Sequence, residues 1–355
     1  MSRLSGVFRD RNRPLLVTFV VGGDPTPEIS VRIAVALADA GADILELGMP
    51  FSDPTGDGPV IERADTRALR AGMTPVRLLS LVREVRRRTT VPIVLLCYYN
   101  NLFRYGLEGF CRDAAAAGVD GLLCVDLPVE QGGALRSACR KAGIDRILVA
   151  APSTSDRRLA RIGRESEGFV YAVSTMGVTG VRDHVPVTIG PLLERLHRVT
   201  GLPVAVGFGV GTPEQARAVA GLGADGVIVG SALVGLIETH LADERVMLDA
   251  LGARVRAIRR ALEGLPPGGS GNAKREEETV LTGTEVVRET VHLDETQSPV
   301  EGEGRFVAGR DGQPDARRTA IPESGDRLPE QGPAVPHPAP VLAYPQAEDP
   351  PDGGV

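Results

Sequence analysis

Two acidic side chains stand where the sequence is otherwise apolar or turn-forming. Glu46 interrupts the apolar residues 44–47, and Asp57 follows in a loop rich in Gly, Pro and Asp. A carboxylate inside an apolar strand is costly unless it is paired or functional, and burial raises its pKa toward the range that suits proton transfer. Two such groups at one site favour acid–base chemistry in which one titrates and the other stays ionised. The alternatives are a structural, salt-bridged Glu46 and a turn-forming Asp57.

Three glycine-bearing segments follow later predicted strands and could bind an anion. Glycine lets backbone N–H groups approach a ligand, and the N-terminus of a short helix favours a phosphate. An ordinary turn explains each segment alone, but the three together, with a short helix after Ser231, are typical of the phosphate site of a barrel enzyme. We therefore expect a phosphorylated small molecule as ligand. The segments are Ser174–His184, Gly207–Thr212 and Gly230–Leu233.

The remaining reactive side chains argue against two common mechanisms. Lysine occurs only as Lys141, near the end of a predicted helix, and Lys274, so no strand-end lysine is available for a Schiff base. The five histidines are scattered, whereas a metal site needs clustered ligands, so no metal is expected. The chemistry that remains is acid–base catalysis by carboxylates, with Tyr171 in a predicted strand as a further candidate.

The elements that position these groups alternate along residues 1–264. Eight short segments are continuously apolar, as parallel strands covered on both faces are, and helical patterns lie between them. Several of these helices end in a G-x-D sequence, where glycine is the usual C-cap. This repetition predicts a (β/α)8 TIM barrel, with an extra short phosphate-binding helix at Ala232–His240. A doubly wound open sheet is the alternative, because periodicity does not decide closure.

The predicted strands are Leu15–Val21, Ala42–Gly48, Val91–Tyr98, Gly121–Val125, Arg146–Ala151, Phe169–Val173, Pro203–Val206 and Gly226–Val229. The predicted helices, besides the extra one, are Glu28–Asp39, Val60–Ala71, Val76–Arg88, Leu107–Ala117, Glu130–Ala142, Asp156–Glu165, Ile189–Val199, Pro213–Ala220 and Glu244–Leu262.

The chain divides into two parts of different composition. Residues 1–264, the predicted catalytic barrel domain, carry a net charge of +3. Residues 265–355 carry a net charge of -9 and 13 of the 27 prolines. An acidic, Pro- and Gly-rich segment buries too little apolar surface to offset its ordering entropy, so we expect this tail to be disordered.

Composition also bears on partners and location. The chain is 42% apolar and 24% charged, the profile of a soluble globular protein, and no apolar run is long enough to cross a membrane. The net charge of -6 and the scarcity of aromatic residues argue against nucleic-acid binding. The basic N-terminus before Leu15–Val21 lacks a signal-peptide cleavage site, so we expect a cytoplasmic protein.

Taken together, the motifs resemble the tryptophan synthase alpha chain family over roughly residues 13–262. The resemblance implies a lyase of tryptophan biosynthesis, which cleaves indole-3-glycerol phosphate to indole and glyceraldehyde 3-phosphate by a retro-aldol reaction without metal or Schiff base. It also implies that Glu46 is the general acid/base that protonates the indole ring carbon, and that Asp57 holds the indole N–H. The motifs that carry it are Leu45–Pro54 with Asp57–Pro59, Gly22–Pro25, Gly177–Gly180, Gly207–Gly209 and Gly230–Ser231.

The same resemblance implies the rest of the substrate site. Tyr171 would line it beside Glu46, and the segment Thr179–His184 resembles a mobile lid that would exclude water, with Thr179 near the substrate. The residues implied for the apolar indole slot are Phe19, Leu96, Leu123 and Phe208. Those implied for the phosphate are Gly180, Gly209, Gly230 and Ser231.

A partner is implied as well. In this family a beta chain, which carries pyridoxal phosphate, forms an α2β2 heterotetramer with the alpha chain and receives indole through a tunnel; no cofactor is expected in the chain itself. Residues 50–58 would face the partner. The sequence departs from the common family pattern at Thr55-Gly56, at Glu62 and at Thr175. The change at Thr55-Gly56 could alter partner contact, and Glu62 adds a negative charge near the site.

Three other functions stay open or are disfavoured at this point. A free-standing lyase that releases indole without a partner stays open. A purely regulatory phosphate-binding barrel would be expected to lose Glu46 or Asp57, and both are present. Indole-3-glycerol phosphate synthase depends on lysine acids, which this barrel cannot supply.

Overall fold

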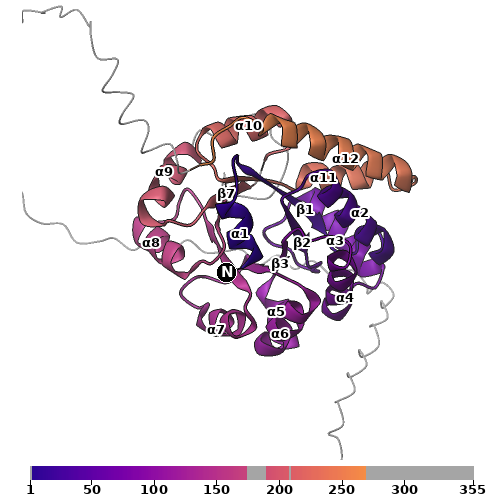
Figure 1. Cartoon of the computed structure of the whole chain (residues 1–355). Helices are drawn as coiled ribbons and strands as arrows, with labels where there is room; N and C mark the ends of the chain where they lie inside the picture. Colours follow the sequence, from indigo (N-terminus) through magenta and orange to yellow (C-terminus); the bar gives the residue numbers. More distant parts are fainter. Residues whose placement is uncertain (1, 174–188, 208, 269–355) are drawn as a thin grey trace, which may run out of the picture. The chain divides into compact units, whose positions relative to one another are not determined.

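The computed structural model describes residues 2–173, 189–207 and 209–268. Its parallel strands are hydrogen bonded in the order β1 to β8, and β8 pairs with β1, so the sheet closes on itself. Figure 1 shows the helices arranged around the strands. The predicted TIM barrel is confirmed, and the open-sheet alternative is wrong. The strands are β1 (Leu15–Val21), β2 (Ile44–Gly48), β3 (Ile93–Cys97), β4 (Gly121–Cys124), β5 (Asp145–Ala150), β6 (Val170–Val173), β7 (Val204–Gly207) and β8 (Gly226–Val229).

Several helices begin at a threonine followed by proline. The hydroxyls of Thr26, Thr74 and Thr212 each accept a hydrogen bond from the backbone N–H three residues later, which satisfies a helix-end donor, and proline suits the first helical position. The helices are α1 (Arg3–Arg9), α2 (Pro27–Asp39), α3 (Pro59–Arg70), α4 (Pro75–Arg86), α5 (Tyr99–Tyr105), α6 (Leu107–Ala117), α7 (Gly133–Ala142), α8 (Asp156–Glu165), α9 (Ile189–Val199), α10 (Pro213–Gly221), α11 (Ser231–Thr239) and α12 (Glu244–Ala261).

Helices α1 and α5 are absent from the sequence-based prediction. α1 lies across the amino end of the barrel (Figure 1), and its Leu4 and Phe8 are fully buried among the inward-facing strand residues. The rings of Phe8 and Phe169 lie 5.5 Å apart between centroids. α1 therefore closes the end of the barrel opposite to the carboxyl ends of the strands.

The aspartates of the G-x-D sequences have a structural role at the amino ends of the strands. Asp43, Asp120 and Asp225 each accept a hydrogen bond from a backbone N–H of the preceding strand and pair with an arginine, which satisfies donors that the ladder leaves free. The strand donors are Leu16, Ile93 and Val204, at 2.7, 2.8 and 2.7 Å, and the arginines are Arg13, Arg86 and Arg11.

The fold leaves the two ends of the barrel with different tasks. Apolar side chains fill the interior and the layer between strands and helices, and α1 seals the amino end, so a ligand site belongs at the carboxyl end. No helix in the described residues is long and apolar enough to cross a membrane. The predicted disordered tail is residues 265–355, of which residues 269–355 lie outside the described part of the chain.

Candidate active site

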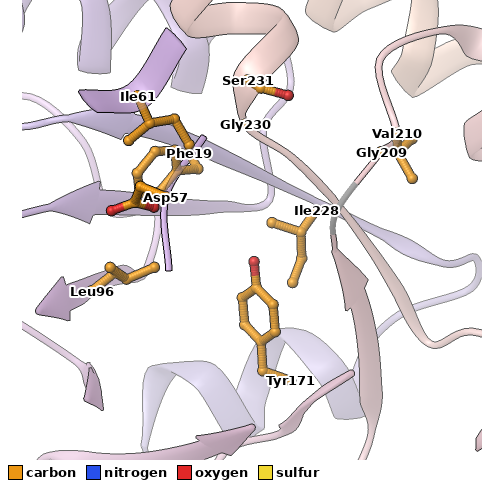
Figure 2. Close-up of a pocket in the computed structure, with 10 residues that line it drawn as sticks. All are labelled: Phe19, Asp57, Ile61, Leu96, Tyr171, Gly209, Val210, Ile228, Gly230 and Ser231. Atoms are coloured by element: carbon orange, nitrogen blue, oxygen red, sulfur yellow. The ribbon is translucent and has the colours of Figure 1, made fainter. Parts of the chain in front are cut away.

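A pocket of about 430 Å³ opens at the carboxyl ends of the strands. Figure 2 shows its walls, which come from β1, β3, β6 and β8, from α3 and its preceding loop, and from the starts of the segments after β7 and β8. Mostly apolar walls with a few polar groups are typical of a site for a small organic ligand. The lining residues are Phe19, Asp57, Ile61, Leu96, Tyr171, Gly209, Val210, Ile228, Gly230 and Ser231.

Glu46 faces the interior of the barrel from β2. It is in register with Phe19, which lines the pocket, and register partners in a sheet share a face. The side chain is buried, and neither carboxylate oxygen has a hydrogen-bond partner among the described residues. Burial first, and then the charge of Asp57, raise the pKa of Glu46 to about 8. At neutral pH the group is therefore mostly protonated and can donate a proton.

Asp57 reaches the pocket from the loop between β2 and α3. It is buried, and the hydroxyl of Tyr98 donates a hydrogen bond to its Oδ2 at 2.9 Å. The pKa of Asp57 is raised to about 6 as the net result of three causes: burial raises it, the hydrogen bond from Tyr98 lowers it, and the charge of Glu62 raises it. At neutral pH Asp57 is therefore mostly ionised, so two nearby carboxyl groups hold different protonation states.

The alternative role for Glu46, a structural salt bridge, has no support in the structure. No cation lies within ion-pair distance of its carboxyl group among the described residues, and its oxygens make no hydrogen bond there. An isolated buried acid of this kind is costly to keep, and such groups concentrate at functional sites.

Glycines at the strand ends make room for the two aromatic walls. A Cβ added to Gly207 would lie 2.6 Å from the Tyr171 hydroxyl oxygen, and one added to Gly230 would lie 3.1 Å from Cδ1 of Phe19. A Cβ on Gly48 would lie 2.9 Å from Cζ of Phe19. Part of the glycine pattern is thus explained by aromatic packing rather than by contact with an anion.

The polar end of the pocket lies at the start of α11. Gly230 and Ser231 line the pocket there, and no side chain of the described residues caps the helix at Gly230. The first N–H groups of a helix and its dipole favour an anion at this position. Gly209 lines the pocket from the segment after β7 with a φ of 85°, a backbone conformation that favours glycine.

The structure places most of the predicted site residues together. Glu46 and Leu123 face the barrel interior below the pocket, with Leu123 in register with Leu96. Predicted residues that line the pocket are Phe19, Asp57, Leu96, Tyr171, Gly209, Gly230 and Ser231. Thr179, Gly180 and Phe208 lie outside the described residues. The roles assigned to all these side chains stay predictions.

Other residues near the site were not found by the sequence reasoning. Ile61, Val210 and Ile228 line the pocket, and Tyr98 contacts Asp57. Ile228 could have been found from the strand alternation of β8, and Ile61 from its place one turn into the helix that follows Asp57. Tyr98 carries no local signal, because its contact bridges two segments 41 residues apart.

A closed eight-stranded α/β barrel with a buried acid pair and a helix N-terminus at one pocket defines a TIM-barrel enzyme. A sequence model of the family "Tryptophan synthase alpha chain" matches residues 7–263. The tryptophan synthase alpha chain of Halorhodospira halophila is 48% identical over 273 residues, which cover 76% of this chain and 99% of that protein. That of Methanoregula boonei is 45% identical over 263 residues, 74% of this chain and 99% of that protein. The chain belongs to the tryptophan synthase alpha chain family and is a lyase.

Solved structures agree with this assignment. A tryptophan synthase structure from Mycobacterium tuberculosis matches with a TM-score of 0.68 and 39% identity, covering 74% of this chain and 98% of that one. The alpha chain from Legionella pneumophila matches with a TM-score of 0.68 and 35% identity, covering 75% and 98%. The similarity therefore extends over nearly the whole length of these relatives.

Proposed function

We propose that this chain cleaves indole-3-glycerol phosphate to indole and glyceraldehyde 3-phosphate. The observation that carries the proposal is the pair Glu46 and Asp57, one mostly protonated and one mostly ionised at neutral pH, at an apolar pocket of a barrel of this family. A neutral acid beside a carboxylate suits a reaction that needs both a proton donor and a site for positive charge.

Each acid has one task in this reaction. Glu46 gives its proton to the indole ring carbon that bears the side chain, and Asp57 stabilises the positive charge that appears on the ring nitrogen. The carboxylate left on Glu46 then takes the proton of the side-chain hydroxyl. As that hydroxyl becomes a carbonyl, the carbon–carbon bond breaks, and its electron pair returns to the ring and neutralises the nitrogen. Glu46 ends protonated, as it began.

The pocket walls suit the two ends of this substrate. Phe19, Leu96 and Ile228 offer an apolar slot for the indole ring, and Gly230 with Ser231 at the start of α11 suit the phosphate. Tyr171 points its hydroxyl into the space between these ends (Figure 2). Its burial raises its pKa well above the ordinary value, so it acts as a neutral hydroxyl.

The proposal extends to the partner and the location. A tryptophan synthase beta chain would receive the indole, and pyridoxal phosphate would belong to that partner, with no cofactor held by this chain. We propose a cytoplasmic location, in keeping with the biosynthetic role of the family. We further propose that residues 1–264 form the catalytic domain, with residues 265–355 as a separate tail.

The test is indole release from indole-3-glycerol phosphate by the full chain, with and without a tryptophan synthase beta chain. We expect Glu46→Gln to lower kcat at least about a hundredfold while KM changes little, because proton transfer is lost and the shape is kept. Asp57→Asn should also lower kcat, because charge stabilisation is lost. Glu108→Gln, at an exposed position of α6 that pairs with Lys141, is the control and should cleave normally.

Wild-type protein that releases no indole under either condition would refute the proposed function. Near-normal turnover by Glu46→Gln would refute the role of that residue alone. Equal rates with and without the beta chain would favour the free-standing lyase over the partner-dependent enzyme.

A further inference from the structure

The side chain of Tyr98 joins three parts of the loop that carries Asp57. Its hydroxyl donates a hydrogen bond to Oδ2 of Asp57 at 2.9 Å and accepts one from the backbone N–H of Gly56 at 3.1 Å. Its ring stacks on Phe51, with 5.1 Å between centroids and 26° between planes. Tyr98 itself is buried and lies between the end of β3 at Cys97 and the start of α5, of which it is the N-cap residue, so the barrel fixes its position. Tyr98 thus contacts Phe51 near the start of the loop, and Gly56 and the acidic residue Asp57 near its end.

We propose that Tyr98 is a positioning residue for the cleavage reaction: its hydroxyl aims the Asp57 carboxylate and keeps it ionised while the indole nitrogen is bound. The inference rests on the proposed function and adds a residue to it. The hydroxyl bonds to one carboxylate oxygen, Oδ2, and so fixes the direction of the group. Phe51 and Gly56 hold the loop that brings Asp57 to this hydroxyl.

The electrostatic surroundings explain why such a donor is needed. The groups that face Asp57 are Glu46 from β2, Glu62 and Asp65 from α3, Tyr171 from β6 and Tyr98. Burial and the charge of Glu62 oppose the ionised form of Asp57. Glu46 and Asp65 each have a pKa of about 8 and are therefore mostly neutral at the pH where Asp57 ionises; the charge of Asp57 contributes to raising the pKa of both. The Tyr98 hydrogen bond acts in the other direction and lowers the pKa of Asp57.

The test is Tyr98→Phe, which removes only the hydroxyl. Without the donor the pKa of Asp57 rises above about 6, so the acid limb of the kcat/KM profile moves to higher pH, by about one pH unit for one lost hydrogen bond. The plateau kcat should fall about tenfold with less change in KM, since the carboxylate loses its direction. A merely structural tyrosine would lower the melting temperature and scale activity down without moving the limb.

A matched control exists in the same region of the chain. Tyr105 also donates a hydrogen bond to an aspartate, Asp113, at 2.8 Å, but this pair lies at the outer helices α5 and α6. Tyr105→Phe should leave the acid limb where it is. A second variant, Phe51→Leu, keeps the Tyr98 hydroxyl and removes the stacked ring, and should shift the limb in the same direction by less.

A measurement without substrate separates this inference from the proposed function. The pKa of Asp57 can be followed by the carboxyl ¹³C resonance of labelled aspartate in the full chain, assigned with Asp57→Asn. A higher pKa in Tyr98→Phe supports the inference even if no indole is released. An unchanged pKa, or an unmoved acid limb in a protein that cleaves, would overturn it and leave the proposed function standing.

Discussion

At the residue scale, the burial of Glu46 opposes folding. Its carboxyl group is buried without a hydrogen-bond partner among the described residues, and burial raises its pKa from 4.5 to about 8. A raised pKa means that the folded protein binds this proton more tightly than the unfolded chain does. Stability from Glu46 is therefore greatest below pH 4.5 and is lost as the pH rises toward 8. The enzyme keeps a destabilising acid at working pH in return for a proton donor.

This cost is measurable in Glu46→Gln. As the pH rises from 5 to 8.5, we expect the melting temperature of the variant, relative to that of the wild type, to increase by several degrees. The reason is that glutamine does not ionise, so the variant does not lose stability as the Glu46 carboxyl does in the wild type. Burial of the glutamine amide also lowers stability, but by the same amount at every pH. The quantity to measure is therefore the change with pH of the difference in melting temperature between variant and wild type. Thermal melts of both proteins across this range check it, with Glu108→Gln as control. A difference that stays flat with pH would contradict the burial argument.

The candidate site could be predicted in part from single residues. Glu46 was found because a charge stands out inside an apolar strand, and Gly230 with Ser231 because glycine precedes a helix pattern. The contact of Tyr98 with Asp57 could not be found, since it depends on how two distant loops meet. The space needed by Tyr171 at Gly207 depends on neighbouring strands and is likewise invisible in the sequence.

At the element scale, α1 is a stability element rather than a site element. Phe8 is buried among inward-facing side chains at the amino end of the barrel, where its ring packs on Phe169. The pocket lies at the other end of the strands. A change in α1 should therefore alter folding free energy without altering substrate contact.

Phe8→Ala tests this division. It should lower the free energy of unfolding by about 3 kcal/mol or more, because a buried aromatic leaves a cavity. KM for indole-3-glycerol phosphate should stay near the wild-type value below the melting temperature. Phe103→Ala is the control, since Phe103 is 66% exposed and should cost little. A raised KM in Phe8→Ala with unchanged stability would reverse the assignment.

The elements themselves were largely predictable, for identifiable reasons. Strands such as β1 and β8 match their apolar runs because parallel strands covered on both faces leave no polar alternation. α5 was missed because Tyr99–Tyr105 has only seven residues, which is too short for a helical period to show in the sequence. Closure of the sheet needed the pairing of β1 with β8, which no local pattern contains.

At the scale of the whole molecule, the family match and the described structure cover similar stretches. The family match ends at residue 263, and α12, the last helix of the barrel, ends at Ala261. The acidic residues that follow have no counterpart in the family match. We propose that the barrel is a complete folding unit without them.

A chain that ends at residue 268 tests that proposal. We expect its melting temperature to lie within about 2 °C of the full chain, because a segment of this acidic, Pro-rich composition can bury too little apolar surface to stabilise the barrel. Indole release should also be unchanged. Thermal melts and the cleavage assay on both chains decide it, and a fall of many degrees would mean that the tail packs on the barrel.

Three aspartates at the amino ends of strands each link an even-numbered strand to the odd-numbered strand before it. Asp43 links β2 to β1, Asp120 links β4 to β3, and Asp225 links β8 to β7, each through a side-chain bond to the preceding strand. The eight repeats are thus not equivalent, since consecutive strands are tied two by two at these places. These three bonds therefore stabilise particular pairs of neighbouring strands, each an odd-numbered strand with the even-numbered strand after it, and not the ring of strands evenly.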